Sequence, residues 1–211
     1  MSVLETEMNA SLDNPLIFLS GKKGEVLSGG NFHGEYVAMM MDTAAIGLAE
    51  LANIADQRIQ KLINPSLSGL PAFLTRDPGL NSGMMIVQVA SASLVSENKV
   101  LSHPASVDSI PTSADKEDHV SMGVTAARKA RQILANVRNV IAMELLCGYQ
   151  GVALLRPLKS RKPLEAVWET IRGIVPPIDE DRAFHADITA IANALYDGRI
   201  LAAAEKAGKL R

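Results

Sequence analysis

The sequence predicts an all-α protein built on long bundled helices, and two observations carry this prediction. Aromatic residues make up only 4% of the 211 residues, whereas alanine, leucine, methionine and isoleucine are common. This balance favours packed helices over a β-sandwich. Apolar residues also recur at helical spacing over two long stretches, 35–63 and 120–155. Helices this long and this broadly apolar seldom stand alone, so we expect a large bundle or a helical oligomer core.

The chain before residue 35 is expected to hold the end of a helix and a hairpin-like excursion. Residues 1–12 have a helical pattern that stops at Asp13-Asn14-Pro15, because proline disfavours helical geometry in the residue before it. A chain whose first residues already lie inside a helical pattern resembles a piece of something longer. Residues 16–33 contain four glycines around two short apolar runs. This pattern indicates a β-hairpin-like excursion or an ordered loop.

Prolines separate the remaining helices. The first long helix ends before Pro65, and a loop rich in proline, glycine and serine follows over 64–80. A second helix over 82–101 stops before Pro104, and a polar stretch over 102–119 precedes the second long helix. Shorter helices are expected at 163–174, 185–196 and 198–209. We expect one domain, with a central bundle and the site loops in 1–155 and a region of short helices in 156–211.

The composition excludes several classes of protein. A net charge of −2 with mixed signs gives no footprint for nucleic acid or an anionic membrane. One cysteine, Cys147, excludes an internal disulfide framework and suits a reducing cytosol. No secretory signal is visible, and charged residues interrupt the longest apolar stretches, which argues against membrane spans. We therefore expect a cytoplasmic protein with no nucleic-acid partner and no membrane partner.

The first candidate site is the glycine-rich segment Gly29–Glu35. Glycines let a backbone approach a ligand closely or adopt positive φ. The segment also leads into a helix N-terminus, where backbone amides favour anions. The alternative is a glycine-rich helix start with a buried phenylalanine, and on spacing alone this structural interpretation is the stronger one.

The second candidate site is 102–119, which holds His103, His119 and four acidic residues within eighteen positions. Such side chains can ligate metals, but their spacing matches no tight pair such as His-Glu-x-x-His, so we expect no metal. The segment is then either a polar surface loop or a functional loop fixed by the helices on both sides. Elsewhere, Cys147 is expected to be a small core residue and His185 to be structural.

At these two segments the sequence resembles the histidine/phenylalanine/tyrosine ammonia-lyase family. The matching stretches keep the family's order and spacing across about residues 4–155. They are Asp13-Asn14-Pro15-Leu16, SGGNFHGE (28–35), LSGLPAFL (67–74), GLNSGMMIVQVASASLVSENK (79–99), SHPASVDSIPTSA (102–114) and EDHVSMG (117–123).

The resemblance implies an all-α fold of long bundled helices, usually a homotetramer whose active sites are shared between subunits. It also implies an electrophile, methylidene-imidazolone, which forms autocatalytically from an internal Ala-Ser-Gly and activates the substrate amine as a leaving group. Ala-Ser-Gly occurs nowhere in the 211 residues. The closest strings, Asn9-Ala10-Ser11-Leu12 and Val89-Ala90-Ser91-Ala92, lack the glycine. The family's tyrosine base and carboxylate-binding arginine are not matched either, so no catalytic residue is assigned.

Two residues resemble substrate-binding residues of the family. Phe32 resembles the aromatic residue packed near the electrophile, and Glu117 resembles the glutamate that meets the substrate side chain. A carboxylate facing an imidazole makes a charge-assisted hydrogen bond, which suits histidine better than phenylalanine. Histidine lyases commonly have glutamine where this chain has Lys116. The lysine cation could neutralise or move Glu117.

The resemblance therefore implies the C-terminal part of a histidine ammonia-lyase, which converts L-histidine to urocanate and ammonia. One alternative is a portion of a tyrosine or phenylalanine ammonia-lyase or of an aminomutase. Another is a non-catalytic helical assembly partner. Because it lacks Ala-Ser-Gly, this chain alone is expected to be inactive. Besides an amino-acid substrate, we expect further copies or a complementary N-terminal chain as partners, because unpaired helix faces would leave a large apolar patch on a monomer.

Overall fold

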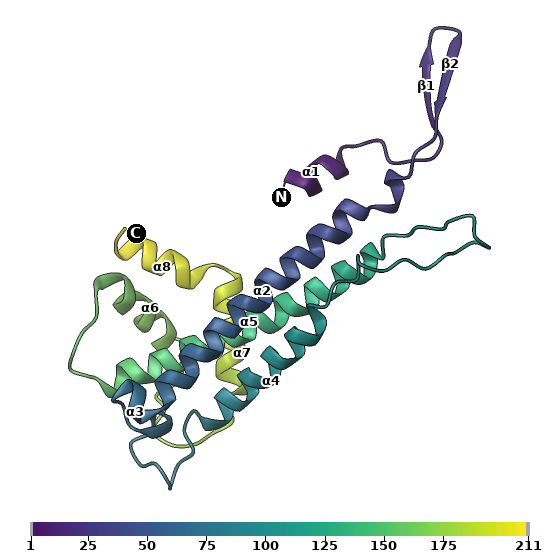
Figure 1. Cartoon of the computed structure of the whole chain (residues 1–211). Helices are drawn as coiled ribbons and strands as arrows, with labels where there is room; N and C mark the ends of the chain where they lie inside the picture. The colour runs from purple at the N-terminus through teal and green to yellow at the C-terminus, as the bar shows by residue number, and fades with distance from the viewer. Residues whose placement is uncertain (1, 210–211) are drawn as a thin grey trace. The chain divides into compact units, whose positions relative to one another are not determined.

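The computed structural model describes residues 2–209, and helices dominate this part of the chain (Figure 1). A short helix, α1 (Ser2–Met8), precedes a hairpin of strands β1 (Leu16–Ser20) and β2 (Lys23–Leu27). The two predicted long helices are present as α2 (Glu35–Ile63) and α5 (Gly123–Leu154), with 29 and 32 residues. The prediction of an all-α chain with a small hairpin near its N-terminus is confirmed.

Contacts within the chain define two compact units. The first unit contains Met1–Leu48 and Lys99–Leu134, and the second contains Ala49–Asn98 and Ala135–Arg211. Helices α2, α5 and α4 (Met85–Leu101) each contribute residues to both units. The expected division near residue 155 stays a prediction.

The first unit is built on small side chains. Ala38 and Ala45 of α2 and Ala126 of α5 are fully buried, and Ile133 of α5 is buried with them. Alanine gives a helix high intrinsic stability and little bulk, so it suits buried positions on long helices. The polar stretch 102–119 between α4 and α5 also belongs to this unit.

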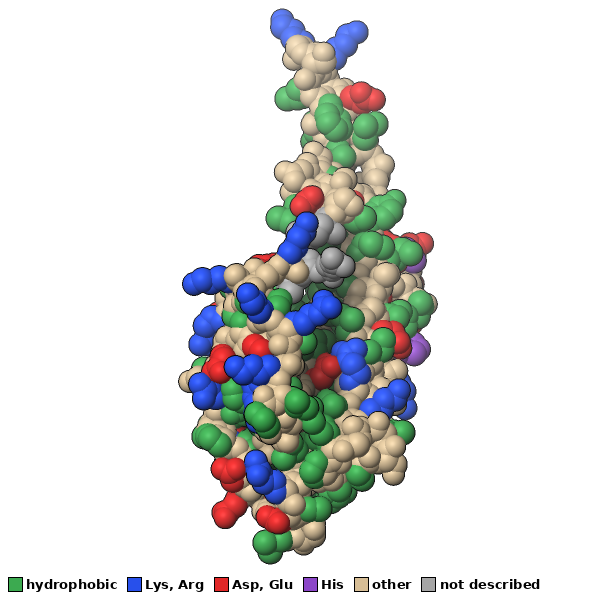
Figure 2. Space-filling model, turned by 90° about the vertical axis from the view of Figure 1, so that its left-hand side faces the viewer, with side chains coloured by type: hydrophobic (Ala, Val, Ile, Leu, Met, Phe, Trp, Pro, Cys, Tyr) green, Lys and Arg blue, Asp and Glu red, His purple; other side chains and the backbone are tan. Residues whose placement is uncertain are grey.

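The hairpin of the first unit has an antiparallel register that pairs Leu16 with Leu27 and Ser20 with Lys23. Gly21, in the turn, has a φ of 63°, a conformation that glycine adopts without a steric penalty. Most hairpin side chains are exposed, including Leu19 and Val26. Figure 2 shows hydrophobic side chains along the hairpin. The hairpin therefore contributes little to the core.

The second unit has the larger apolar core. It joins α2, α4 and α5 to α6 (Lys162–Arg172), α7 (His185–Tyr196) and α8 (Arg199–Ala207). Helix α8 packs against both α6 and α7. The fully buried members with the largest side chains are Ile59, Leu74, Met84, Leu146, Ile171 and Ile191. The predicted short helices are thus confirmed, with ends that differ by one or two residues.

The segment 64–80 was expected to be a loop, but it contains two helical turns. Asn64 caps the short helix α3 (Pro65–Ser68), because its side-chain oxygen accepts a hydrogen bond from the Ser66 amide at 3.0 Å. A 3₁₀ turn, η2 (Ala72–Leu74), follows. The helical pattern expected over 1–12 also ends early, at Met8. At the end of α1, Asn9 Nδ2 donates a hydrogen bond to the Glu5 carbonyl at 2.7 Å. At both helices a local side-chain hydrogen bond therefore marks the boundary, and apolar periodicity does not.

One helical stretch of the described residues, Asn31–Ile63, is long and apolar enough to cross a membrane, with a mean hydropathy of 1.3. Core helices of helical bundles share this length and composition. Four carboxylates lie in this stretch, those of Glu35, Asp42, Glu50 and Asp56, and such groups are costly in hydrocarbon. The absence of a membrane span stays a prediction.

Candidate functional site

Phe32 lies at the start of α2, on the 3₁₀ turn η1 (Asn31–His33). Its ring contacts the His33 ring in a tilted arrangement, with centroids 4.1 Å apart and planes at 35°, and 41% of the residue is exposed. Gly34 follows with a φ of 69°, which allows the chain to turn directly into α2 at Glu35. The alternative interpretation was a glycine-rich helix start with a buried phenylalanine. It is wrong about the burial of Phe32. Phe32 presents an accessible aromatic face.

Asn14 holds the beginning of this glycine-rich segment. Its side-chain oxygen accepts hydrogen bonds from Ser28 Oγ at 3.0 Å and from the Gly29 amide at 3.1 Å. The motif Asp13-Asn14-Pro15 and the motif around Phe32 are therefore connected directly, although the whole hairpin separates them in sequence.

Asp42 holds the beginning of the second candidate segment. The residue is 3% exposed, and its Oδ2 accepts hydrogen bonds from the amides of Ala105 and Ser106, both at 2.8 Å. Lys129 Nζ lies 3.8 Å from Asp42 Oδ1 and also donates a hydrogen bond to the His103 carbonyl. A buried carboxylate is stable only when it is paired and hydrogen-bonded. The loop supplies the two amide donors, and Lys129 of α5 supplies the opposite charge.

Glu117 lies in a short antiparallel bridge with Thr112. The Thr112 amide donates to the Glu117 carbonyl at 2.8 Å, and Thr112 Oγ1 donates to Glu117 Oε2 at 2.7 Å. Between them Ser113, Ala114 and Asp115 all have positive φ, from 55° to 64°. Non-glycine residues rarely adopt this conformation, and runs of strained backbone cluster at functional sites. Glu117 is half-buried, whereas its neighbour Asp118 is exposed.

The two candidate segments meet in the first unit. Ser121 Oγ donates a hydrogen bond to the His33 carbonyl, and the Gly123 amide donates to Ser121 Oγ at 3.1 Å. His119 Nε2 lies 3.9 Å from Glu35 Oε2. A hydrogen bond thus joins His33, which follows Phe32, to Ser121, which lies four residues after Glu117. The two residues lie just before α2 and α5, respectively. Phe32 and Glu117 themselves stay predicted substrate-binding residues.

Lys116 is exposed and forms no ion pair with Glu117 among the residues that the structure describes. The partner of the Glu117 carboxylate is instead the neutral hydroxyl of Thr112. Thr112 is a residue that sequence reasoning missed, together with Asp42 and Asn14. The one available signal for Asp42 was its place as a charged residue among the apolar positions of residues 35–63.

The other candidates have structural surroundings. Cys147 is fully buried in the core, and burial, aided by the charge of Glu144, raises the pKa of its thiol to about 12. This confirms the interpretation of Cys147 as a core residue. His185 is the exposed first residue of α7. Within residues 2–209, no three His, Cys, Asp or Glu side chains are grouped to hold a metal ion.

The surroundings of Ser91 do not fit the family electrophile. Ser91, in one of the two nearest strings, is fully buried inside α4 and is followed by Ala92. A helical backbone without a following glycine does not offer the tight turn that cyclisation requires. No step of a reaction is assigned to the electrophile in this chain.

A family model described as aromatic amino acid lyase matches residues 1–173. The chain belongs to the aromatic amino acid lyase family. It is 56% identical to a histidine ammonia-lyase of Symbiobacterium thermophilum, over 96% of this chain and 40% of that protein. It is 52% identical to one of Caenorhabditis elegans, over 94% of this chain and 29% of the relative. The chain thus spans at most about 40% of these curated lyases.

Solved structures of the same family have the same fold. A histidine ammonia-lyase from Trypanosoma cruzi superimposes with a TM-score of 0.92 at 51% identity, over 98% of this chain and 41% of that chain. A tyrosine aminomutase from Streptomyces globisporus reaches a TM-score of 0.92 at 37% identity, over 100% of this chain and 40% of that one. Because a lyase and an aminomutase fit equally well, the backbone alone does not discriminate between reactions. Sequence identity favours the histidine ammonia-lyases, of which this chain is a homologue.

Proposed function

We propose that this chain supplies part of the active site of a histidine ammonia-lyase, which eliminates ammonia from L-histidine to give urocanate. The observation that carries the proposal is the fixed carboxylate of Glu117, held by Thr112 on a segment joined to the start of α2 beside Phe32. Eight curated relatives that are 49–56% identical to this chain are all histidine ammonia-lyases.

Glu117 would recognise the imidazole. Thr112 takes one lone pair of Oε2, which leaves Oε1 open to a donor. An imidazole N–H that donates to an ionised carboxylate forms a charge-assisted hydrogen bond, which is stronger than a bond between neutral groups. The exposed face of Phe32 would pack against a planar group.

The elimination itself needs a group that this chain does not form. In the family, methylidene-imidazolone made from Ala-Ser-Gly activates the substrate amine as a leaving group. The 211 residues contain no Ala-Ser-Gly, so we propose that this chain alone is inactive. A complementary chain would carry the electrophile, within a cytoplasmic oligomer that also covers the exposed helix faces.

Complementation tests the proposal. The chain would be co-expressed with the part of the Symbiobacterium thermophilum lyase that it does not match, and the product followed by the absorbance of urocanate. We expect urocanate from L-histidine only when both chains are present. The matched control is the second chain with its Ala-Ser-Gly serine changed to alanine. A soluble, co-purifying complex that forms no urocanate would overturn the proposal.

A second candidate is a tyrosine or phenylalanine lyase or an aminomutase, and the fit to tyrosine aminomutase favours keeping it. The same complex assayed with L-tyrosine and L-phenylalanine separates these reactions, because coumarate, cinnamate and β-amino acids are distinct products. A third candidate, a non-catalytic helical partner, is supported by a complex that forms but converts none of the three amino acids.

A further inference from the structure

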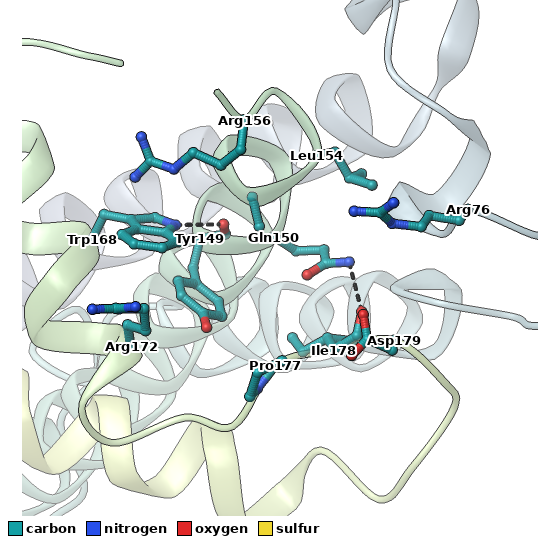
Figure 3. A pocket seen from close by; sticks show the side chains of 11 residues that line it. Arg76, Tyr149, Gln150, Leu154, Arg156, Trp168, Arg172, Pro177, Ile178 and Asp179 are labelled. Atoms are coloured by element: carbon teal, nitrogen blue, oxygen red, sulfur yellow. Dashed lines mark hydrogen bonds between the residues drawn. The ribbon is translucent and has the colours of Figure 1, made fainter. Parts of the chain in front are cut away.

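A cavity of about 280 Å³ lies wholly within the second unit, between the end of α5, helix α6 and the segment before α7. Figure 3 shows Arg76 and Asp179 on one side of it and Trp168 and Arg172 on the other. None of its lining residues belongs to the segments around Phe32 or Glu117. The cavity is therefore not part of the site described above.

Hydrogen bonds and ring contacts hold the wall around Trp168, and each arginine in this wall has an acidic partner. Trp168 Nε1 donates to the Tyr149 carbonyl at 3.1 Å, and the two rings stack with centroids 5.5 Å apart. The Arg156 guanidinium lies 4.0 Å from the Trp168 ring centroid and binds both oxygens of Glu165, at 3.1 and 2.9 Å. Arg172 pairs with Glu169 at 2.7 Å. Since the charges of Arg156 and Arg172 are compensated, they offer little to a ligand.

The floor of the cavity is also preorganised. Gln150 is 5% exposed, and its amide nitrogen donates to the carbonyls of Leu74 at 3.1 Å and Ile178 at 2.9 Å. Tyr149 is 4% exposed as a whole residue, and no hydrogen bond of its hydroxyl is found among the described residues. In Figure 3 this hydroxyl points away from the α5 backbone, on the side of Arg172 and Pro177. A hydroxyl without a partner in the chain is a polar group available to a ligand, as donor or as acceptor.

Two opposite charges of the lining remain uncompensated. Within residues 2–209, neither the Arg76 guanidinium nor the Asp179 carboxylate forms an ion pair or a side-chain hydrogen bond. They do not approach within the 4.0 Å that an ion pair requires, although both line the same cavity. A ligand that carries both charges on neighbouring atoms would satisfy each of them.

We propose that this cavity binds a free α-amino acid, with its carboxylate on Arg76, its ammonium group on Asp179 and an apolar or aromatic side chain on the wall of Tyr149 and Trp168. Guanidinium groups match the fork of a carboxylate, and an ammonium group is a compact donor for an aspartate. A volume of about 280 Å³ suits a molecule the size of phenylalanine. The site takes no part in the proposed elimination, so it would be a second amino-acid site, separate from the segments around Phe32 and Glu117.

Trp168 makes the site directly measurable, because it is the single tryptophan of the chain. The full 211-residue chain would be titrated with L-phenylalanine while Trp168 fluorescence is recorded. 3-Phenylpropanoate, which lacks the amine, and phenethylamine, which lacks the carboxylate, are the matched ligands. We expect saturable binding of phenylalanine in the millimolar range, about 4 kcal/mol, and binding at least about tenfold weaker for each analogue.

Variants test the two charges separately. Arg76→Gln and Asp179→Asn should each weaken phenylalanine binding by at least about tenfold. Arg131→Gln, an exposed arginine of the first unit, and Glu117→Ala should leave the fluorescence titration unchanged. The Glu117 control also keeps the outcome independent of the proposed lyase function. Circular dichroism would confirm that each variant is folded.

Two results would overturn the proposal. In the first, 3-phenylpropanoate binds as tightly as phenylalanine and Asp179→Asn has no effect, which describes a simple anion site. In the second, none of the three ligands gives a saturable change in Trp168 fluorescence up to about 50 mM, which is weaker than about 2 kcal/mol of binding.

Discussion

Thr112 Oγ1 donates a hydrogen bond to Glu117 Oε2 at 2.7 Å, across a turn in which three consecutive residues have positive φ. The bond fixes the orientation of the carboxylate that we propose to recognise the substrate. Thr112 is therefore a positioning residue, since it acts through Glu117. Its effect should be visible in the kinetics of the complemented enzyme.

Thr112→Val removes the hydroxyl and keeps the shape of the side chain. We expect kcat/KM for histidine to fall about three- to thirtyfold, which corresponds to one hydrogen bond to a charged group at a partly exposed position. Thr112→Ser keeps the donor and should remain within about twofold of the parent enzyme. Equal losses in the two variants would assign the effect to turn packing instead.

Asp42 anchors the start of the same segment through the amides of Ala105 and Ser106. Asp42→Ala leaves both amides without their acceptor and removes the carboxylate that faces Lys129, so the free energy of unfolding should fall by about 2–3 kcal/mol. Urea denaturation measures this loss, and hydrogen exchange should accelerate at residues 105 and 106. Glu50→Ala, at an exposed carboxylate on the same helix, should change stability by less than about 0.5 kcal/mol.

Gly83 lies where only glycine fits. Its φ is 53°, and a Cβ atom there would clash with the Phe73 carbonyl oxygen. The adjacent Met84 amide donates to that same oxygen at 2.8 Å, and Asp181 accepts from the Gly83 amide at 2.8 Å, so the backbone cannot move away. Gly83→Ala should lower the melting temperature, with a loss of at least about 2 kcal/mol.

Gly148→Ala is the matched control for this substitution. Gly148 lies within α5, and a Cβ atom there would meet nothing within 4 Å. Because alanine favours helix more than glycine, this variant should be up to about 1 kcal/mol more stable. If both variants are destabilised to the same extent, the close approach at Gly83 is not the cause.

Cys147 should be chemically inert in the folded chain. Burial raises the pKa of its thiol from 9.0 to about 12, and only the thiolate is nucleophilic. Because the folded pKa is the higher one, folding favours the protonated thiol. Its contribution to stability is complete below pH 9 and is lost as the pH rises from 9 towards 12.

Alkylation by iodoacetamide at pH 8 measures this directly. We expect the modification rate to rise by at least about a hundredfold when the chain is unfolded in urea, because native thiolate is scarce and inaccessible. Cys147→Ala should lose less stability than the parent chain as the pH rises above 9. Rapid modification under native conditions would contradict the buried position.

Apolar periodicity was sufficient to predict the fold. It located α2 at its observed bounds and α7 at 185–196, because buried positions on a helix repeat every 3.6 residues whatever the partner is. It failed at α3, where a capping asparagine and a proline, rather than apolar spacing, form the helix. Helix ends depend on single hydrogen bonds, which periodicity does not contain.

The candidate site was predictable only in part. Glycine and carboxylate patterns, together with the family resemblance, located Phe32 and Glu117. They did not reveal Thr112 as the partner of Glu117, nor Asp42 as the anchor of Ala105, since the latter contact joins residues 63 positions apart. Such pairs depend on how helices and loops fold back on one another. Likewise, the sequence does not show that Arg76 and Asp179 lack ion-pair partners. This is known only from the structure, in which the other two arginines of the cavity, Arg156 and Arg172, are paired with glutamates.

The substrate itself can be tested by comparing Glu117 with Asp118. In the complemented enzyme acting on histidine, Glu117→Ala should lower kcat/KM by about thirty- to a thousandfold, roughly 2–4 kcal/mol, because a charge-assisted hydrogen bond to the imidazole is lost. Asp118 is exposed, and its carboxylate has no hydrogen bond among the described residues, so Asp118→Ala should have a much smaller effect. If phenylalanine is the true substrate, there is no imidazole to lose, and Glu117→Ala should have a mild or favourable effect on kcat/KM.

The variant Lys116→Gln should raise histidine turnover only if the lysine screens Glu117. Because Glu117 is bonded to Thr112 and forms no ion pair with Lys116, we expect turnover to change by less than about twofold. Equal and small effects of Glu117→Ala and Asp118→Ala on histidine would remove the ground for assigning histidine as the substrate.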